Sequence, residues 1–270
     1  MIQGHALRGE NMSWIEALIL GIIQGLTEFL PISSTGHLYL GRHLFGLDSA
    51  GLYLDTMLHI GTLLAVFVFY KDELWHMIRH PFSKLTFLLI IGTIPAVVVG
   101  LLFKDYFEEI SITGSTIGWE FLVTGLFLWF ADSVKKGAKK MHDISYKDAL
   151  FIGTFQAAAI FPAVSRSGLT MAAALMRKLD RETAAYFSFL LSTPAICGAV
   201  LLQLKDVVGG GVEYISFFSL FVATCSAALF GYMAVKWMIH YLKHHSLKTF
   251  AVYVWILGLI VLVCQFTGVF

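Results

Sequence analysis

Four stretches of this chain are each long enough to cross a lipid bilayer as a helix, and none of them contains Asp, Glu, Lys or Arg. About 20 apolar residues in a helix span the bilayer core. In that environment every backbone polar group must be hydrogen-bonded within the protein, which a helix achieves without help from water. The chain is therefore predicted to fold as a bundle of membrane helices. The four stretches are residues 85–103, 183–204, 214–235 and 249–270.

Two further stretches qualify although they carry a few polar residues. Residues 52–70 contain only Asp55 and His59, and residues 115–133 contain two acids near their ends. Together with the four charge-free stretches they bring the predicted number of membrane-spanning helices to six.

The composition excludes several other classes of protein. Of the 270 residues 57% are apolar and only 14% are charged, whereas about 25% are charged in an ordinary soluble domain. The formal net charge is only +1. A soluble globular enzyme, a disordered chain and a nucleic-acid-binding protein are therefore excluded. The three cysteines lie in apolar stretches and show no disulfide or metal-binding spacing.

Two other apolar regions are each interrupted in the middle. The first covers residues 14–47 and is broken at Pro31-Ile-Ser-Ser-Thr-Gly, and the second covers residues 149–178 and is broken at Pro162-Ala-Val-Ser-Arg-Ser-Gly. The second piece of each region is too short to cross a bilayer. We therefore expect two re-entrant helical hairpins, each with a loop at membrane depth. Such a loop is stable only where it is buried in protein or lines a cavity.

The two interrupted regions form an internal repeat. Residues 21–24 align with residues 153–156, and the tip segment 33–36 aligns with 165–168, both at an offset of 132. Three predicted spans follow each region.

The predicted fold class is therefore an all-α integral membrane protein with six transmembrane helices and two re-entrant hairpins in an inverted-topology repeat. A single membrane domain over residues 1–270 would contain one repeat at 14–134 and another at 149–270. Because an odd number of crossings separates the hairpins, they enter from opposite faces. Their tips can then meet near the midplane, as in inverted-repeat transporters.

The distribution of Lys and Arg favours this arrangement. It places 14 of them on one side and 4 on the other, with Arg166 in the second hairpin tip. If the first piece of each interrupted region crossed completely, the counts would be 10 and 8. Cytoplasmic loops are rich in Lys and Arg, so the first arrangement is preferred and both termini are expected outside. A signal peptide over residues 1–30 is the alternative, but only Arg8 precedes its apolar part and no small-residue cleavage site follows.

Polar side chains at membrane depth mark the candidate site. Ionisable groups there are costly and usually functional. Glu28 lies one helical turn after Gln24, His37 lies in the next predicted helix, and Arg166 is the basic residue of the second tip. The alternatives are a purely structural ion pair between Glu28 and Arg166, and packing roles for Gln24 and His37. His59, inside a predicted span, is interpreted as a packing histidine.

Hydroxyl groups surround both breaks. As helix caps they would satisfy free backbone N–H groups, but two helix N-termini directed at one site also form an anion pocket. The guanidinium of Arg166 suits phosphate oxygens, and glycine lets a backbone approach a ligand closely. The pattern predicts a phosphate or diphosphate site that either transports or hydrolyses its ligand. Its further residues are Ser33, Ser34, Thr35, Gly36, Ser165, Ser167, Gly168 and Thr170.

The two tip motifs resemble those of a known family. The run Gln24-Gly-Leu-Thr-Glu28-Phe-Leu-Pro-Ile-Ser-Ser-Thr-Gly-His37, with Pro162-Ala-Val-Ser-Arg166-Ser-Gly-Leu-Thr170, closely resembles the BacA/UppP-type undecaprenyl-diphosphatases. The resemblance covers nearly the whole chain. It implies release of the terminal phosphate of undecaprenyl diphosphate, recycling of the lipid carrier for peptidoglycan and other wall polymers, and bacitracin resistance. It also implies a divalent cation (Mg or Ca), the bacterial plasma membrane, and six spans with two re-entrant hairpins.

The resemblance also implies roles for individual residues. Glu28, Ser34, His37 and Arg166 are the expected catalytic residues, and Glu28 is also the expected metal ligand. Two departures from the family pattern stand out. Gln24 replaces a carboxylate, which weakens the case for a two-carboxylate metal site, and Ala163 stands where Gly is usual. The residues expected to bind the diphosphate are Gln24, Ser33, Thr35, Gly36, Ser165, Ser167, Gly168 and Thr170.

The sequence leaves several alternatives open. The nucleophile is either Ser34 or water, Glu28 is either a metal ligand or the general base, and His37 would protonate the leaving lipid monophosphate. A transporter or flippase of a lipid phosphate or another anion is the second functional class. A structural membrane subunit is the third, but it leaves the charges of Glu28 and Arg166 unexplained. The oligomeric state is also open, a homodimer included.

Overall fold

The fold is entirely helical wherever the chain is described. The computed structural model describes residues 12–47, 52–134, 137–209 and 215–268. Within these ranges the only extended pairing is an isolated bridge between Lys139 and Leu179. The predicted all-α class is therefore confirmed. The helices are α1 Trp14–Phe29, α2 Ser34–Phe45, α3 Leu52–Phe69, α4 Lys71–Arg79, α5 Lys84–Leu102, α6 Lys104–Thr113, α7 Ile117–Ser133, α8 Tyr146–Ala158, α9 Arg166–Met176, α10 Arg181–Gly209, α11 Phe217–His244 and α12 Lys248–Phe266, with a 3₁₀ turn at Met141–Asp143.

Four helices are long and apolar enough to cross a membrane. They are α5, α11, α12 and the Arg181–Leu204 part of α10, and they coincide with the four charge-free stretches. A fifth span results if α3 and α4 are counted as one, although α4 turns away from α3 by 78°. The sixth predicted span, α7, has 17 residues and is not among them. The chain therefore contains four to five candidate membrane spans in its described part.

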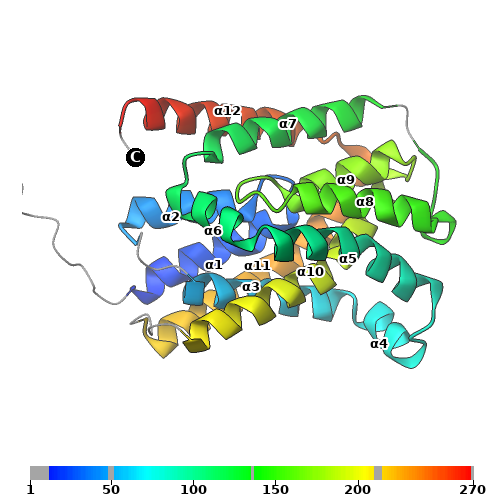
Figure 1. Ribbon diagram of the computed structural model, residues 1–270, viewed down its shortest axis with the longest axis horizontal. Coiled ribbons are helices and arrows are strands. Elements are labelled where there is room, and N and C mark those ends of the chain that lie inside the picture. Colours follow the sequence, from blue (N-terminus) through cyan, green and yellow to red (C-terminus); the bar gives the residue numbers. More distant parts are fainter. Residues whose placement is uncertain (1–11, 48–51, 135–136, 210–214, 269–270) are drawn as a thin grey trace, which may run out of the picture.

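Helix α4 lies between the predicted spans 52–70 and 85–103 and is not itself predicted. By helical spacing Asp72, His76 and Arg79 form its polar face, whereas Trp75 and Ile78 are exposed apolar residues. Figure 1 shows α4 at the end of the bundle opposite to the C-terminal end of α12. Because one face is polar and the other is apolar, α4 is an amphipathic helix at the rim of the bundle.

Both interrupted regions form pairs of short helices, as predicted. In the first pair α1 ends at Phe29, two residues before Pro31, and α2 starts at the N-cap Ser33. In the second pair α8 ends at Ala158, and Ser165 caps the start of α9. A proline disfavours helix at the residue that precedes it, and a serine cap satisfies one of the free N–H groups of the next helix. We call α1–α2 the first hairpin and α8–α9 the second hairpin.

Small residues bring the hairpins into close contact with long helices. Helix α1 packs against α11, and α8 packs against α5. A Cβ atom added to Gly21 would lie only 2.5 Å from the carbonyl oxygen of Ala223 on α11. A Cβ atom at Gly153, the repeat-related position, would overlap the backbone of Gly92 on α5. Since α11 and α5 are each the second long helix after a hairpin, the contacts of the two hairpins are equivalent.

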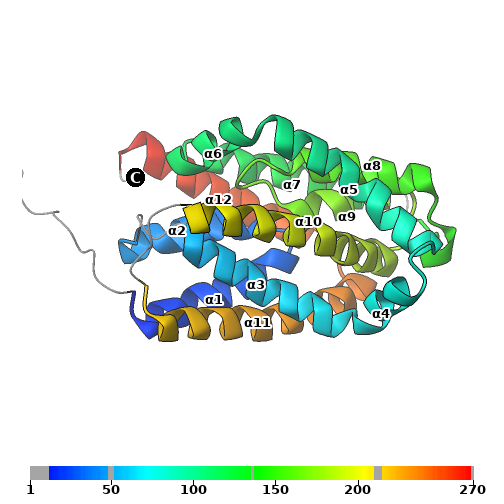
Figure 2. The same cartoon turned by 60° about the horizontal axis from the view of Figure 1, so that its bottom comes forward.

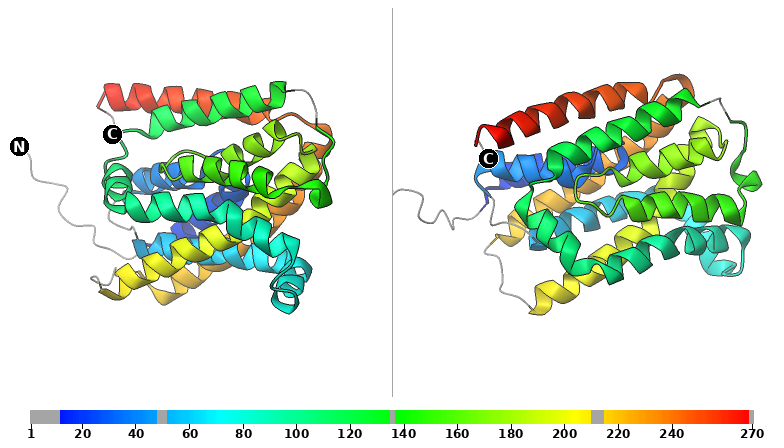
Figure 3. Two further views of the ribbon diagram at one scale, coloured as in Figure 1. Left: turned by 45° about the vertical axis from the view of Figure 1, so that its right-hand side comes forward. Right: turned by 45° about the horizontal axis from the view of Figure 1, so that its top comes forward.

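The other long helices also pack in pairs that the repeat relates. Helix α7 packs along α12, and α3 packs against α10; each of these pairs joins corresponding helices of the two repeats. Figure 2 shows α3 between α10 and α11. Both views of Figure 3 show α7 and α12 side by side along one edge of the bundle. Each hairpin therefore packs one face against the long helices, whereas the outer faces of α1 and α8 keep exposed residues such as Ile15 and Leu150.

Candidate active site at the hairpin tips

The tips of the two hairpins contact each other inside the bundle. The Ser167 hydroxyl donates a 3.0 Å hydrogen bond to the carbonyl oxygen of Leu30. A Cβ atom on Gly168 would lie 3.4 Å from Pro31, and one on Gly36 would lie 3.1 Å from the Cβ of Ala163. A side chain at Gly36 would therefore press against the second tip, whereas a Cβ at Gly168 would make an ordinary van der Waals contact with Pro31. The two tips, which the sequence predicts to lie close together, are thus in direct contact in the structure.

Glu28 is the centre of the polar contacts between the tips. One carboxylate oxygen, Oε1, accepts a hydrogen bond from Nη2 of Arg166. The other, Oε2, accepts hydrogen bonds from the Ser34 hydroxyl at 2.5 Å and from Nε2 of Gln24 at 3.2 Å. The Glu28 side chain is only 5% exposed, and that of Arg166 19%. The structure therefore joins four of the predicted site residues in one buried cluster.

The N-termini of α2 and α9 open into the same region. The hydroxyl of Ser33 accepts the N–H of Gly36 at 3.3 Å, and the hydroxyl of Ser165 accepts the N–H of Gly168 at 3.1 Å. The first N–H groups of each helix have no acceptor within that helix. Two positive helix ends therefore lie beside Arg166, an arrangement that favours a bound anion.

Ser33 also carries backbone strain. Its φ angle is +73°, in the region that residues with a side chain rarely adopt. Strained residues of this kind cluster at functional sites. The residue that follows it is Ser34, whose hydroxyl contacts Glu28.

His37 and Thr170 have partners other than Glu28. The Nδ1 atom of His37 lies 2.6 Å from the carbonyl oxygen of Ser33, so it must carry the proton of that hydrogen bond. Its Nε2 lies 2.8 Å from the hydroxyl of Tyr253 on α12. The Thr170 hydroxyl donates to the carbonyl oxygen of Arg166 at 2.8 Å and lies 2.5 Å from the Ser188 hydroxyl. Thr170 therefore ties α9 to α10.

His59 belongs to the Glu28 cluster, which the sequence interpretation missed. Its Nε2 lies 4.0 Å from Oε2 of Glu28. Its Nδ1 is bound to the carbonyl oxygen of Asp55 at 2.7 Å, and Asp55 pairs with Arg42 at 2.5 Å. The available signal was an ionisable residue in the middle of an apolar span. The sequence does not show which helix α3 faces, so this signal alone does not connect His59 with Glu28.

Helix α7 also supplies polar atoms to the second tip. The Glu120 carboxylate accepts the backbone N–H of Ala163, and the Thr124 hydroxyl accepts that of Ser165 at 3.1 Å. From the sequence, Glu120 is one of the two acids near the ends of the predicted span 115–133, and nothing in the sequence indicates a role for Thr124.

Comparison with known proteins places the chain in a family. The family described as bacitracin resistance protein BacA matches residues 17–260. This chain belongs to the BacA family. It is 73% identical to undecaprenyl-diphosphatase 3 of Bacillus cereus, over 96% of this chain and the full length of the relative. It is 47% identical to the undecaprenyl-diphosphatase of Carboxydothermus hydrogenoformans, again over 96% of this chain and all of the relative. It is 40% identical to that of Halothermothrix orenii, over 93% of this chain and 98% of the relative.

The candidate site of this BacA-family protein fits a divalent cation only if substrate phosphates supply part of the coordination. Among the described residues no three acidic, His or Cys side chains are grouped so that they could hold a metal ion. However, Oε1 of Gln24 is buried without a hydrogen-bond partner, and the same side chain touches Glu28. Mg²⁺ is commonly held by one or two protein oxygens together with substrate phosphates and water. Glu28 and Gln24 match that limited protein contribution.

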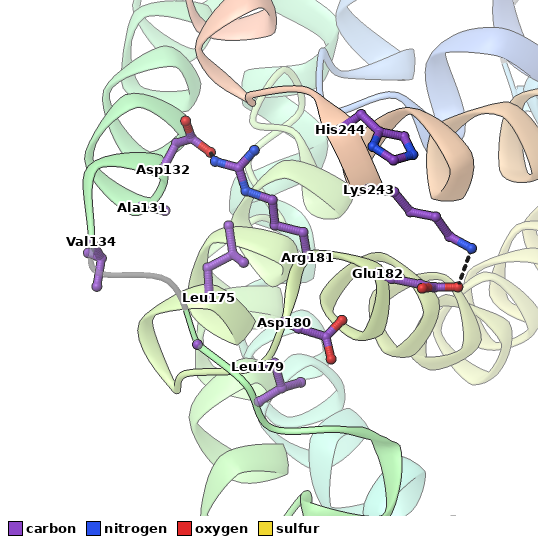
Figure 4. A pocket seen from close by; sticks show the side chains of 11 residues that line it. Ala131, Asp132, Val134, Leu175, Leu179, Asp180, Arg181, Glu182, Lys243 and His244 are labelled. Carbon is purple, nitrogen blue, oxygen red and sulfur yellow. Dashed lines mark hydrogen bonds and ion pairs between the residues drawn. The ribbon is translucent and has the colours of Figure 1, made fainter.

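A separate cavity of about 380 Å³ lies at the α4 end of the bundle of this BacA-family protein. It is formed by the ends of α7, α9, α10 and α11 (Figure 4). Its charges neutralise one another, because Arg181 pairs with Asp132 and Lys243 pairs with Glu182. None of the sequence-predicted site residues lines it. The tips, where a buried cation and anion meet two helix N-termini, are therefore the better candidate.

Proposed function

We propose that this protein hydrolyses undecaprenyl diphosphate to undecaprenyl phosphate and inorganic phosphate. The reaction would recycle the lipid carrier for cell-wall synthesis and confer bacitracin resistance. The observation that carries the proposal is the contact of Glu28 with both Ser34 and Arg166 at the point where two helix N-termini converge. Relatives that share up to 73% of the sequence over their full length are named undecaprenyl-diphosphatases.

In the proposed mechanism Arg166 and the helix N-termini hold the phosphates. The guanidinium has five N–H donors, so contact with Glu28 through Nη2 leaves others for phosphate oxygens. The free N–H groups at the starts of α2 and α9 add neutral donors to the same anion. Phosphoryl transfer depends mainly on such positioning and charge neutralisation.

Glu28 acts as the general base in this proposal. Its Oε2 lies 2.5 Å from the Ser34 hydroxyl, within reach for proton transfer. Either Ser34 itself or a water held there attacks the terminal phosphorus, and Glu28 accepts the proton of the nucleophile. The bond from that phosphorus to the bridging oxygen breaks, and lipid monophosphate leaves. A phosphorylated Ser34 would then be hydrolysed by water with Glu28 again as base.

His37 is the proposed acid for the leaving lipid monophosphate. Its Nδ1–H is bound to the backbone of Ser33, so the proton for the leaving group would come from Nε2 of the doubly protonated imidazolium. Tyr253, 2.8 Å from Nε2, orients the ring. A Mg²⁺ or Ca²⁺ ion held by Glu28 and Gln24 would neutralise further phosphate charge when bound.

We also propose the six-span arrangement with two re-entrant hairpins for this chain. The repeats would be residues 14–134 and 149–270, in the bacterial plasma membrane, with both termini outside. The equivalent packing of α1 on α11 and of α8 on α5 supports it, as does pairing of α7 with α12 and of α3 with α10. The excess of Lys and Arg at the α4 end supports a cytoplasmic location of that end.

The deciding experiment measures phosphate release from a polyprenyl diphosphate by the purified full chain. We expect hydrolysis that Glu28→Gln removes while the protein stays folded, because the amide cannot accept the proton of the nucleophile. Glu182→Gln, a half-exposed acid at the far end of the bundle, is the matched control and should retain full activity. Movement of the lipid across a vesicle bilayer without phosphate release would instead establish the transporter class.

A further inference from the structure

The second hairpin tip is bound through its backbone to two buried side chains of α7. Oε2 of Glu120 accepts the N–H of Ala163, and Oγ1 of Thr124 accepts the N–H of Ser165 at 3.1 Å. Glu120 is 5% exposed and Thr124 is fully buried. The two residues lie one helical turn apart, on the same face of α7.

These two acceptors meet a need that the tip cannot meet by itself. Between Ala158 and Arg166 the backbone is not helical. The N–H groups of Ile160 and Val164 are bound within the tip, whereas those of Ala163 and Ser165 are bound to side chains of α7. A buried N–H group without an acceptor is unfavourable. Glu120 and Thr124 therefore select one conformation of the tip from those that its sequence allows.

The selected conformation determines where α9 begins. Ser165 is the N-cap of α9, and its hydroxyl accepts the N–H of Gly168. The next residue, Arg166, reaches across to Glu28. A shift of the Ser165 backbone would move the first turn of α9 and the Arg166 guanidinium together. Thr124 thus influences the position of Arg166, and hence its contact with Glu28, through Ser165.

Helix α7 touches the first tip as well. The ring of Phe121 is so close to Gly36 that an added Cβ would lie 2.6 Å from it, and the ring packs edge-on against His37 at 5.5 Å between centroids. Phe121 follows Glu120 directly in the sequence. One segment of α7 therefore supports both tips at the point where they meet.

We propose that Glu120 and Thr124 are positioning residues that hold the second tip so that Arg166 and the N-terminus of α9 face Glu28 and the terminal phosphate. The proposal rests on the diphosphatase function proposed above. It accounts for two buried polar side chains on α7 that the catalytic cluster does not use.

Thr124→Val is the test, because valine keeps the shape of threonine and removes the acceptor. We expect kcat for phosphate release to fall by about 10- to 100-fold, since displacement of a reacting group by about 1 Å can cost that much. The KM for the lipid should change less than kcat, because the polyprenyl tail contributes binding that does not depend on the tip. Thr124→Ser, which restores the hydroxyl, should recover most of the activity. Thr93→Val is the matched control, because the Thr93 hydroxyl contacts only the carbonyl oxygen of Leu89 in its own helix.

A second measurement separates this proposal from the proposed function. The melting temperature of each purified full-chain variant is measured with and without inorganic pyrophosphate. The wild type and Thr124→Ser should be stabilised by pyrophosphate, whereas folded Thr124→Val should respond weakly. If the wild type shows this response but releases no phosphate from the lipid, the diphosphatase function is wrong and the positioning role stands.

Glu120→Met provides an independent variant should Thr124→Val fail to fold. Its thioether has a similar length but removes the strong oxygen acceptors that bind the Thr116 hydroxyl and the Ala163 N–H. We expect the same loss of kcat with a small change in KM. Wild-type kcat in folded Thr124→Val, or an equal loss in Thr124→Ser, would overturn the proposal. A full effect of Thr124→Val in an Arg166→Ala background would also overturn it.

Discussion

At the scale of single residues, the site consists of polar groups that satisfy one another in an apolar surrounding. Glu28 accepts hydrogen bonds from three side chains, two of its own hairpin and one of the other. A buried carboxylate of this kind is stable only while its partners remain. Loss of any one of these hydrogen-bond donors is therefore expected to disturb both the charge and the position of Glu28. An informative substitution changes only one of the two.

Arg166→Lys keeps the positive charge but loses the planar pair of donors. We expect kcat/KM for phosphate release to fall by about 100-fold or more, which corresponds to about 3 kcal/mol of transition-state stabilisation. Most of the loss should be in kcat, because phosphate charge shifts between oxygens in the transition state. Arg177→Lys, at the other end of α9, is the control. A folded Arg166→Lys protein that turns over at the wild-type rate would contradict the proposed mechanism.

Gln24→Glu places a second carboxylate one helical turn from Glu28. We expect activity to be retained and the concentration of Mg²⁺ or Ca²⁺ for half-maximal activity to fall, since two carboxylates hold a hard cation better than one. The measurement is phosphate release during cation titration after chelation. Gln203→Glu, which keeps the oxygen that accepts the Thr56 hydroxyl and lies on α10 away from Glu28, should leave the titration unchanged. Inactivity of Gln24→Glu would show instead that Gln24 is needed as the amide donor to Glu28.

At the scale of helices, ion pairs outside the candidate spans join elements that are distant in sequence. The fully buried carboxylate of Asp148 at the start of α8 contacts Lys139 at 3.0 Å and Arg177, beyond the end of α9, at 2.6 Å. Burial on its own would raise the pKa of Asp148, but hydrogen bonds from Ser145, Lys139 and Arg177 hold that pKa well below its ordinary value. The start of α8 and the end of α9 are thereby tied together.

Asp148→Asn should lower the free energy of unfolding by about 1–3 kcal/mol, less than for a fully buried pair because Lys139 and Arg177 reach water. Because the folded-state pKa of Asp148 is lowered, its contribution is fully present above the ordinary aspartate pKa of about 3.9 and is lost as pH falls below it. The melting temperatures of wild type and Asp148→Asn in detergent should therefore differ at neutral pH and converge below pH ~4. Asp143→Asn, an exposed acid nearby, should melt like the wild type throughout. A gap that persists unchanged at low pH would show that the charge of Asp148 is not the cause.

At the scale of the whole molecule, the hairpins of the two repeats pack against equivalent long helices. In Figures 1 and 2 the start of α1 and the end of α12 lie at one end of the bundle, and α4 lies at the other. The proposed topology places these ends on opposite sides of the plasma membrane. This can be tested without any assumption about the reaction.

Single cysteines report the topology once Cys197, Cys225 and Cys264 have been replaced. A cysteine at Ser115, exposed between α6 and α7, should be labelled in intact cells by an impermeant thiol reagent. A cysteine at His142, exposed near the 3₁₀ turn, should be protected until the cells are opened. Both positions should be labelled equally in open cells, which controls for reactivity. Labelling of both in intact cells would exclude the inverted-repeat topology.

The amino-acid sequence by itself determined the class of this protein and the outline of its site. Charge-free stretches define membrane helices because a bilayer leaves no alternative for the backbone. Prolines and serine caps define the breaks because they act on neighbouring residues only. The pairing of Glu28 with Gln24 is equally local, since it joins two residues of one helix.

Only the tertiary structure decided which helix faces each polar side chain. Arg166 meets Glu28 across 138 residues of chain, His37 meets Tyr253 on α12, and His59 faces Glu28. An apolar helix in a bilayer shows no polar face to indicate its rotation, so its few polar residues give no direction by themselves. The direction comes from small residues such as Gly21 and Gly153, which fix how closely helices pack and thereby which side chains meet.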